Sequence, residues 1–486
     1  MTRKRIILTA AVTAAVTAIL TLAVLLIIDT TKKPSFTVID PREDRPHISM
    51  YKNLPPTMSY AAGMLLYSAA GDTDTKKIAD ETVRYTRFYK APHLEKALCE
   101  YNAIQRGKVA AGSVIYIPHP LPSIMPDMRN RAKSPLIFTR GLYYTGPSAG
   151  SDKILKQMEN YDKAGINTVV FDAKDVTGYV NYNSSVPDVL ELKTSSHRSI
   201  EDIDKLIREL KSRNIYVIAR IACFRDQLLA KAQPEWAIHS KRTGGLWNEN
   251  TGEIWCDPTN IRLQDYNLQM AIELADKGVD EIQFDYIRFP TSGELSDARF
   301  AWSEGVTTNE KCIERFLSRA YKEISSRNVN LSIDVFGIVA WGHEKDIEKT
   351  GQRITLLSKW CDVISPMLYP SHFSDNFDGY AKPGDNPYYF INEGCKKFMA
   401  QSGKAAIRPW LQAFGWRVSN YSPDYIREQV RASNDAAAKG YLFWNAGNNY
   451  DYVFKALKEM RPGRSEISLN DKKTKAGDKG TAREAL

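Results

Sequence analysis

The stretch DEIQFDYIRFP, residues 280–290, decides which fold this sequence is expected to adopt. Apolar side chains at every second position from Ile282 alternate with Gln283 and Asp285, which is the period of a β-strand. The carboxyl group of Asp285 falls at the end of that strand, shortly before Arg288. In barrels of parallel strands, the strand ends carry the chemistry. Asp285 is therefore a candidate functional group; capping of the next helix or pairing with Arg288 is the structural alternative.

Strand-like segments recur on both sides of this stretch. They cover residues 137–144, 168–173, 216–223, 281–286, 331–336, 363–369, 409–414 and 440–444. Between them, apolar side chains recur at helical spacing, as in the stripe formed by Ile200, Ile203, Leu206, Ile207 and Leu210. Alternating strands and helices indicate a parallel sheet covered by helices. The predicted fold class is therefore α/β. Eight such units favour a closed (β/α)8 TIM barrel over residues 134–462, and an open, doubly wound sheet is the alternative.

Charge and motif content exclude several classes of protein. The net charge of +9 is concentrated near the two ends of the 486-residue chain, and no zinc knuckle or basic helix occurs. We therefore expect no nucleic-acid partner. No GxGxxG follows the first strand and no GxxxxGK[ST] occurs, which argues against nucleotide binding. The six cysteines include no CxxC pair, so no disulfide framework is expected.

The N-terminal segment predicts membrane attachment. Residues 6–28 carry no charge and are apolar enough to span a bilayer as a helix. The basic residues Arg3, Lys4 and Arg5 favour a cytoplasmic N-terminus. No small-x-small cleavage site ends the apolar run, so we expect an uncleaved signal anchor over residues 1–28, with a cleaved signal peptide as the alternative. The remaining chain would then be membrane-anchored and extracytoplasmic.

A small module precedes the barrel. Residues 29–56 and 119–133 are expected to be linkers, and residues 463–486 a disordered tail. Between the linkers, residues 57–118 contain GDT (71–73), IA (78–79), LEKAL (94–98), YN (101–102) and AGSVIYIP (111–118). This order resembles a LysM module, a βααβ fold that in its family binds N-acetylglucosamine-containing glycans. Extra residues around 81–90 depart from the pattern, and a packing module is the alternative.

Polar side chains gather at the predicted strand ends, which converge on one pocket in a barrel. In strand order they are Asp172 and Lys174, Arg220, Asp285, Asp334, Tyr369, Gln412 and Trp444. A buried carboxylate without a partner is costly, so we expect these acids to pair with Lys174, Arg220 or Arg288. A purely structural ion-pair network is the alternative interpretation.

Two of these acids have the arrangement that glycoside hydrolysis needs. The reaction uses one carboxyl group as an acid and a second as a nucleophile or base. Asp285 and Asp334 end adjacent predicted strands, which lie about 4.8 Å apart, so they could reach the ~5–5.5 Å separation of a retaining enzyme. We assign Asp285 as the nucleophile and Asp334 as the general acid/base. The alternative acids are Asp172, Asp175 and Glu344.

Five motifs in order carry a family resemblance. They are FDAKD (171–175), WCDP (255–258), EIQFDYIRFP (281–290), SPMLYP (365–370) and GYLFWN (440–445). Over residues 135–460 the chain resembles a glycoside hydrolase-like barrel family of bacterial envelope proteins. The resemblance implies a TIM barrel, distantly similar to the alpha-amylase-like hydrolases, with a nucleophilic Asp on the fourth strand. The chain departs from the cellulase pattern, because Asp285 and Gln412 stand where that group has glutamates.

The expected function is hydrolysis of an envelope or extracellular polysaccharide, including peptidoglycan. Sugar rings stack on aromatic faces, and tryptophans lie near the predicted strand ends at positions Trp247, Trp255, Trp341, Trp416 and Trp444. The expected substrate-binding residues are Asp172, Lys174, Arg220, Trp255, Asp257, Arg288, Tyr369, Gln412 and Trp444. The two other hypotheses are a non-catalytic glycan-binding or scaffolding protein and a metal-dependent carbohydrate deacetylase.

Metal and cofactor motifs are not evident. The seven histidines form no HExxH, so we expect neither a catalytic zinc nor a cofactor. A hard cation held by Asp172, Asp175 and Asp285 is the alternative.

Overall fold

The structure, a computed structural model, describes residues 47–49, 51–61, 63–88, 90–121, 124–126, 133–302 and 307–460. The predicted signal anchor (1–28), most of the first linker and the predicted tail (463–486) lie outside these residues. No helix in the described part of the chain combines the length and hydrophobicity that crossing a bilayer requires.

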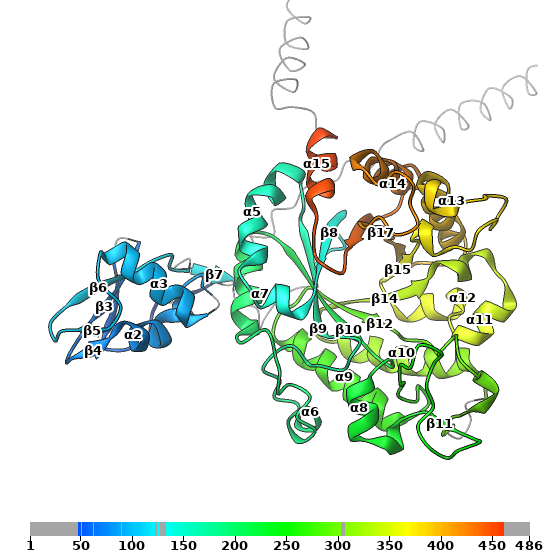
Figure 1. Ribbon diagram of the computed structural model, residues 1–486, viewed down its shortest axis with the longest axis horizontal. Helices are drawn as coiled ribbons and strands as arrows, with labels where there is room; N and C mark the ends of the chain where they lie inside the picture. The colour runs from blue at the N-terminus through cyan, green and yellow to red at the C-terminus, as the bar shows by residue number, and fades with distance from the viewer. Residues whose placement is uncertain are drawn as a thin grey trace, which may run out of the picture. The chain divides into compact units, whose positions relative to one another are not determined.

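Within residues 133–460 a closed barrel of parallel strands forms the centre of the fold (Figure 1). Its strands are β8 (Thr139–Tyr144), β9 (Thr168–Lys174), β10 (Tyr216–Ala222), β12 (Glu281–Asp285), β14 (Asn330–Phe336), β15 (Val363–Met367), β16 (Ala406–Ile407), β17 (Trp410–Gln412) and β18 (Gly440–Trp444). The segments β16 and β17 both pair with β15 and form one interrupted strand, since Pro409 between them offers no N–H to the ladder. Eight strand positions result, as predicted.

The sheet closes on itself, because β18 pairs with β8 and β14 pairs with β15. An open sheet would leave two unpaired edges, so the doubly wound alternative is wrong. The predicted strands differ from the observed ones mainly at their ends. The sixth was expected to reach Tyr369 but ends at Met367, and the fourth ends at Asp285.

Helices surround the strands (Figure 1). The longer ones are α5 (Lys153–Ala164), α7 (Ile203–Ser212), α9 (Ile261–Asp276), α10 (Asn309–Ser325), α13 (Pro387–Met399), α14 (Pro423–Asp435) and α15 (Asp451–Glu459). Short helices and strands in the loops are α4 (Gly146–Ala149), α6 (Pro187–Glu191), α8 (Gln227–Ala232), α11 (Glu344–Thr350), α12 (Ile354–Leu357), β11 (His239–Ser240) and β13 (Ala298–Arg299). The stripe predicted from Ile200 becomes helical only at Ile203, because the Asp202 side chain caps the helix by accepting from Lys205 N–H.

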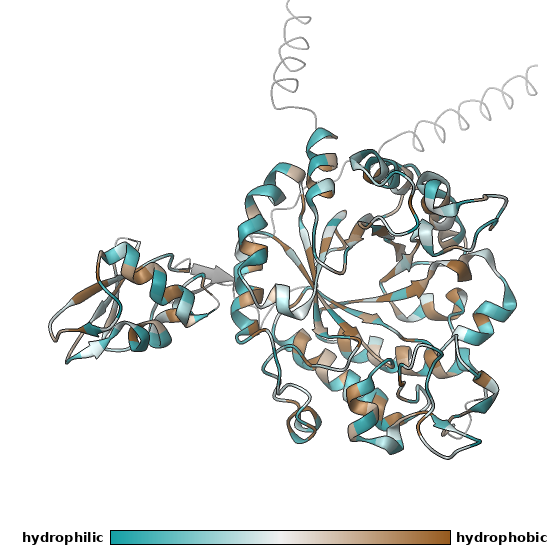
Figure 2. Cartoon of the chain, viewed as in Figure 1, coloured by the Kyte–Doolittle hydropathy of each residue, from teal (hydrophilic) through white to brown (hydrophobic). Residues whose placement is uncertain are grey.

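The barrel core has an apolar outer layer and a partly polar interior. Between strands and helices lies one continuous buried apolar cluster, and Figure 2 shows brown and teal residues along the strands. At the start of the strands, Arg408 pairs with Glu281 through Nη2 and Oε1 at 2.5 Å, and Tyr216 donates to Glu281 at 3.0 Å. These side chains are fully buried and fix the end of the barrel opposite the strand carboxyl ends. All six cysteines are free thiols.

The module of residues 57–118 has its own small core. Its elements are the antiparallel strands β2 (Met58–Ala61), β3 (Met64–Ser68) and β6 (Val114–Ile117), the pair β4 (Thr73–Asp74) and β5 (Lys108–Val109), and helices α2 (Thr75–Thr82) and α3 (Ala91–Asn102). The short strands β1 (His47–Ser49) and β7 (Ile124–Pro126) pair with each other. The order β3–α2–α3–β6 agrees with a βααβ plan, but the LysM resemblance and its glycan binding stay predictions.

Candidate active site

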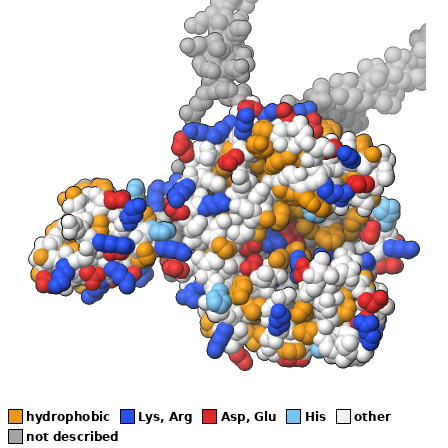
Figure 3. Space-filling model, in the orientation of Figure 1, with side chains coloured by type: hydrophobic (Ala, Val, Ile, Leu, Met, Phe, Trp, Pro, Cys, Tyr) orange, Lys and Arg blue, Asp and Glu red, His pale blue; other side chains and the backbone are white. Residues whose placement is uncertain are grey.

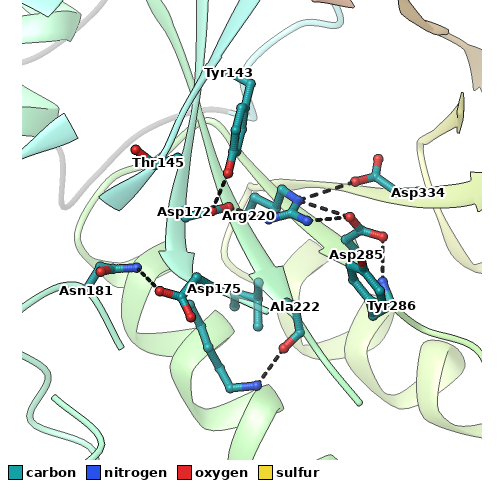
Figure 4. A network of polar contacts seen from close by, with 12 residues as sticks. Tyr143, Thr145, Asp172, Asp175, Asn181, Arg220, Ala222, Asp285, Tyr286 and Asp334 are labelled. Atoms are coloured by element: carbon teal, nitrogen blue, oxygen red, sulfur yellow. Dashed lines mark hydrogen bonds and ion pairs between the residues drawn. The ribbon is translucent and has the colours of Figure 1, made fainter. Parts of the chain in front are cut away.

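Four charged side chains meet at the carboxyl ends of neighbouring strands (Figure 4). Asp172 on β9 lies opposite Arg220 on β10, and Asp285 ends β12 beside Ala222 of β10. Asp334 follows on β14, the next strand along the barrel. The parallel ladder therefore brings together residues that are far apart in the sequence.

Arg220 is the cation at the centre of this cluster. It donates to Asp285 Oδ2 from Nη2 at 2.5 Å and from Nε at 3.1 Å, and it pairs with Asp172 through Nη1. Its Nε also lies 3.9 Å from Asp334 Oδ2. Burial alone would lower the pKa of Arg220, but the carboxylates of Asp172 and Asp285 raise it well above its ordinary value. Arg220 is thus permanently charged and holds two carboxylates in place.

The chain turns sharply after Asp285. Tyr286 has φ of +51°, in the left-handed region that non-glycine residues rarely adopt. This conformation ends the strand one residue earlier than predicted, and it lets the Tyr286 N–H donate to Asp285 Oδ1 at 2.6 Å. Asp285 is therefore held at both oxygens, by Arg220 and by the backbone. Such strain is concentrated at functional sites.

The acids of the cluster outnumber its cation. Three buried carboxyl groups share one guanidinium, so full ionisation would leave uncompensated buried charge. Asp172 accepts from Arg220 and, at 2.5 Å, from Tyr143. Asp334 receives only the Trp410 indole N–H at 2.8 Å, and its Oδ2 has no hydrogen-bond partner. Burial, and then the neighbouring Asp285 carboxylate, raise the pKa of Asp334 well above its ordinary value, which favours a proton on Asp334. Burial also raises the pKa of Asp172, but attraction from Arg220 opposes that rise.

This proton predicts a pH-dependent effect of Asp334→Asn. A carboxyl group whose folded pKa is raised stabilises the protein below its unfolded pKa of about 3.9 and loses that contribution as the pH rises through the folded pKa. Asn keeps the acceptor for Trp410 and never ionises. We therefore expect the variant to gain stability relative to wild type between pH 4.5 and pH 8, measured by urea unfolding of both proteins at each pH. A difference that is independent of pH would contradict a proton on Asp334.

Several predicted site residues lie outside this cluster. Lys174 is fully buried, pairs with Asp226 at 2.8 Å and donates to the Ala222 carbonyl at 2.5 Å. Asp257 accepts from the N–H groups of Ala301 at 2.6 Å and Thr259 at 2.8 Å, so it anchors loops. These two residues support the site from a distance, and they do not contact the acids.

The alternative acids have other partners. Asp175 accepts from the backbone and side chain of Thr177 and from Gly178 N–H, which organises the loop after β9. Glu344 starts α11 on the surface, where a hydrogen bond from Arg353 lowers its pKa. Glu344 thus pairs with Arg353 on the surface and is not part of the buried cluster around Arg220.

A series of aromatic side chains in contact with one another extends from the acidic cluster to the surface. Trp444 stacks on Tyr143 with ring centroids 6.1 Å apart and touches Phe414 at 5.4 Å. Tyr369 contacts Phe414 at 5.7 Å. His372 then joins this group to Trp416, at 5.2 Å from Tyr369 and 5.3 Å from Trp416. Trp416 is 56% exposed, and the barrel face in Figure 3 is hollowed near its centre.

The other predicted tryptophans and Gln412 mainly stabilise loops. Trp247 donates to the Glu294 carbonyl at 3.0 Å, and Trp341 donates to Asp378 at 2.7 Å. Gln412 is fully buried and bridges two loops, accepting from Ser371 N–H and donating to the Phe414 carbonyl.

Sequence reasoning missed Tyr143 and Trp410. Tyr143 donates to Asp172, and Trp410 donates to Asp334. Both lie on barrel strands, but the sequence-based prediction of the site used only charged and other polar residues near the strand ends. Applying the two-residue alternation to aromatic residues with a donor group would have identified them. In the described part of the chain, no group of three or more His, Cys, Asp or Glu residues could hold a metal ion.

A closed (β/α)8 barrel with carboxyl groups and aromatic rings at its strand ends has the architecture of a glycoside hydrolase. Residues 141–450 match the domain family DUF4015, described as "Putative glycosyl hydrolase domain". The match spans most of the chain, so the protein belongs to this family. The resemblance inferred from the five sequence motifs is thereby confirmed.

Solved structures that resemble the chain include several glycoside hydrolases. A hypothetical protein from Ruminiclostridium thermocellum ATCC 27405 is 37% identical over 40% of this chain and 97% of that one, with a TM-score of 0.36. The PgaB (BpsB) glycoside hydrolase domain from Bordetella bronchiseptica is 13% identical over 67% and 99%, with a TM-score of 0.49. The spore cortex-lytic enzyme SleL of Bacillus megaterium QM B1551 is 11% identical over 81% and 86%, with a TM-score of 0.39. No match was found among curated proteins.

Proposed function

We propose that the protein is a retaining glycoside hydrolase that acts on an envelope or extracellular polysaccharide, with peptidoglycan as one candidate. The observation that carries the proposal is the pair of buried carboxyl groups around Arg220, with Asp285 bound to the guanidinium and Asp334 beside it. Family membership supports the reaction class. The apolar segment of residues 6–28 supports a membrane-anchored, extracytoplasmic location.

The two acids fit the two roles of the reaction. Asp285 attacks the anomeric carbon and forms a glycosyl ester, while Asp334 gives its proton to the leaving oxygen. Water then displaces Asp285, and Asp334 recovers a proton from that water. Arg220 places a positive charge against the nucleophile, and the raised pKa of Asp334 suits a group that donates a proton. Asp285 Oδ2 lies 3.1 Å and Asp334 Oδ2 3.9 Å from the same Arg220 Nε, so the two carboxyl groups lie near each other, as direct displacement by Asp285 requires.

The aromatic group proposed to bind the glycan lies on one side of the acids. Tyr369, Trp444 and Trp416 present ring surface on which the apolar faces of successive sugars can stack. Because the rings extend from the buried acids to the exposed Trp416, the arrangement suits a chain of several sugars.

Hydrolysis and its stereochemistry test this proposal. The full-length protein is expected to release reducing ends from at least one substrate in a panel of peptidoglycan and other bacterial polysaccharides. Proton NMR of the first product should show the anomeric configuration of the substrate. A product of inverted configuration would contradict the nucleophilic role of Asp285. A wild-type protein that hydrolyses no substrate of the panel would contradict the proposed hydrolase activity.

A non-catalytic glycan-binding role is the second candidate. It is favoured by the low exposure of the acids, which is 6% for Asp285 and 1% for Asp334. A barrel that only binds should retain its polysaccharide in pull-down experiments when both acids are replaced by Asn. It should also release no reducing ends before or after replacement.

A further inference from the structure

Arg288 is a buried cation for which the described part of the chain supplies no anion. Its side chain is 7% exposed, and no described carboxylate lies within ion-pair distance of it. Its one hydrogen bond runs from Nη1 to the Phe289 carbonyl at 2.9 Å. A guanidinium has five N–H groups, so most of its donors are unused. Nε and Nη2 are not among the fully buried atoms that lack a partner, and they therefore reach solvent.

Aromatic rings surround this guanidinium. Its Cζ lies 4.2 Å from the centre of the Phe336 ring, 4.7 Å from Trp255 and 5.3 Å from Tyr286. Cation–π contacts of this kind compensate part of the cost of burial and restrict the orientation of the side chain. The indole N–H of Trp255 is also buried and has no acceptor among the described residues.

Three other arginines at the strand ends and in the barrel interior have carboxylate partners. Arg220 binds Asp172 and Asp285, Arg225 binds Glu253 at 2.6 Å, and Arg408 binds Glu281. An unpaired buried charge costs several kcal/mol, and burial lowers the pKa of the Arg288 guanidinium. Only longer-range attraction from Tyr286, Glu249 and Asp285 opposes that shift. The fold therefore maintains a costly cation for which the described residues supply no counter-ion.

The position of Arg288 links it to the proposed reaction. Tyr286 connects the two, because its N–H binds Asp285 Oδ1 while its ring lies beside Arg288. An anion bound to Arg288 would thus lie close to the sugar that Asp285 contacts. The aromatic group with Trp416 has no unpaired cation of this kind, so it would bind sugar faces and Arg288 a charged substituent.

We propose that Arg288 binds a carboxylate carried by the substrate, so that the glycan is an acidic one. This inference rests on the proposed function and specifies its substrate class. A planar carboxylate suits the open edge of a guanidinium, to which it can bind through two parallel hydrogen bonds. The carboxylate belongs to a uronic acid or to the lactyl group of a muramic acid that carries no stem peptide.

A binding experiment on the full-length Asp285→Asn protein tests the inference without requiring hydrolysis. The probes are oligogalacturonate and peptidoglycan glycan strands, each compared with a form in which its carboxyl groups are reduced to alcohols. Calorimetry should show one of the two native probes binding about 10- to 100-fold more tightly than its reduced form. Arg288→Met should abolish this preference, and Arg288→Lys should retain part of it.

Arg262→Met is the matched control, since Arg262 makes a cation–π contact with the Trp236 ring at 6.0 Å and forms no hydrogen bond or ion pair with Asp172, Asp285 or Asp334 in the described part of the chain. It should leave the preference unchanged. Equal binding of native and reduced probes, or no binding of either, would overturn the inference even if the wild type hydrolyses a neutral glycan. Selective binding without any hydrolysis would support carboxylate binding by Arg288 and would contradict the proposed hydrolase activity. The comparison of native with reduced probes needs no substitution at Arg288. It therefore still tests the inference if the Arg288 variants fail to fold.

Discussion

Asp285→Asn is expected to reduce the rate of hydrolysis by on the order of 10⁴-fold. The amide has the size of the carboxyl group and can still accept the Tyr286 N–H, but it cannot form a glycosyl ester or stabilise positive charge on the sugar. The rate of reducing-end release from the substrate found in the panel measures the effect. Circular dichroism and urea unfolding of the same preparations show whether the barrel is intact.

Two comparisons make this result specific to the nucleophile. Asp265→Asn removes another ion-paired aspartate, which binds Arg319 on the outer helices, and should leave the rate unchanged. In Asp285→Gly, azide can occupy the vacated space and attack the same face of the sugar. It should restore turnover and give a glycosyl azide of inverted configuration. Residual activity in Asp285→Asn close to that of wild type would rule out Asp285 as the nucleophile.

The barrel could be predicted because its signals are local. Each strand shows apolar residues in a short run, and each covering helix shows an apolar stripe, so the order of elements can be inferred without knowledge of contacts. Strand ends were less certain. The end of β12 depends on the left-handed conformation of Tyr286, and β16 and β17 are separated at Pro409, effects that a two-residue period does not reveal.

The ion-pair partners could not be predicted, because they depend on register. Asp172 and Lys174 were expected on the same side of their strand. The pairing of β9 with β10 shifts between Arg220 and Ile221, so that Asp172 faces Arg220 while Lys174 lies opposite Ile221. A bulge of this kind inserts one residue and redirects the side chains that follow. Lys174 consequently pairs with Asp226, and Arg220 alone serves the acids.

Arg220→Met is expected to lower the free energy of unfolding by about 3–5 kcal/mol at neutral pH, because it leaves buried carboxyl groups without their cation. Burial raises the pKa of Asp172 and Arg220 opposes that rise. Without Arg220 this pKa would rise further, so the variant should lose further stability relative to wild type as the pH increases above about 4. Urea unfolding between pH 4 and pH 8 measures both effects. Arg225→Met breaks the partly exposed pair with Glu253 and should cost at most about 1 kcal/mol. Equal, pH-independent losses in the two variants would show that Arg220 does not hold the acids together.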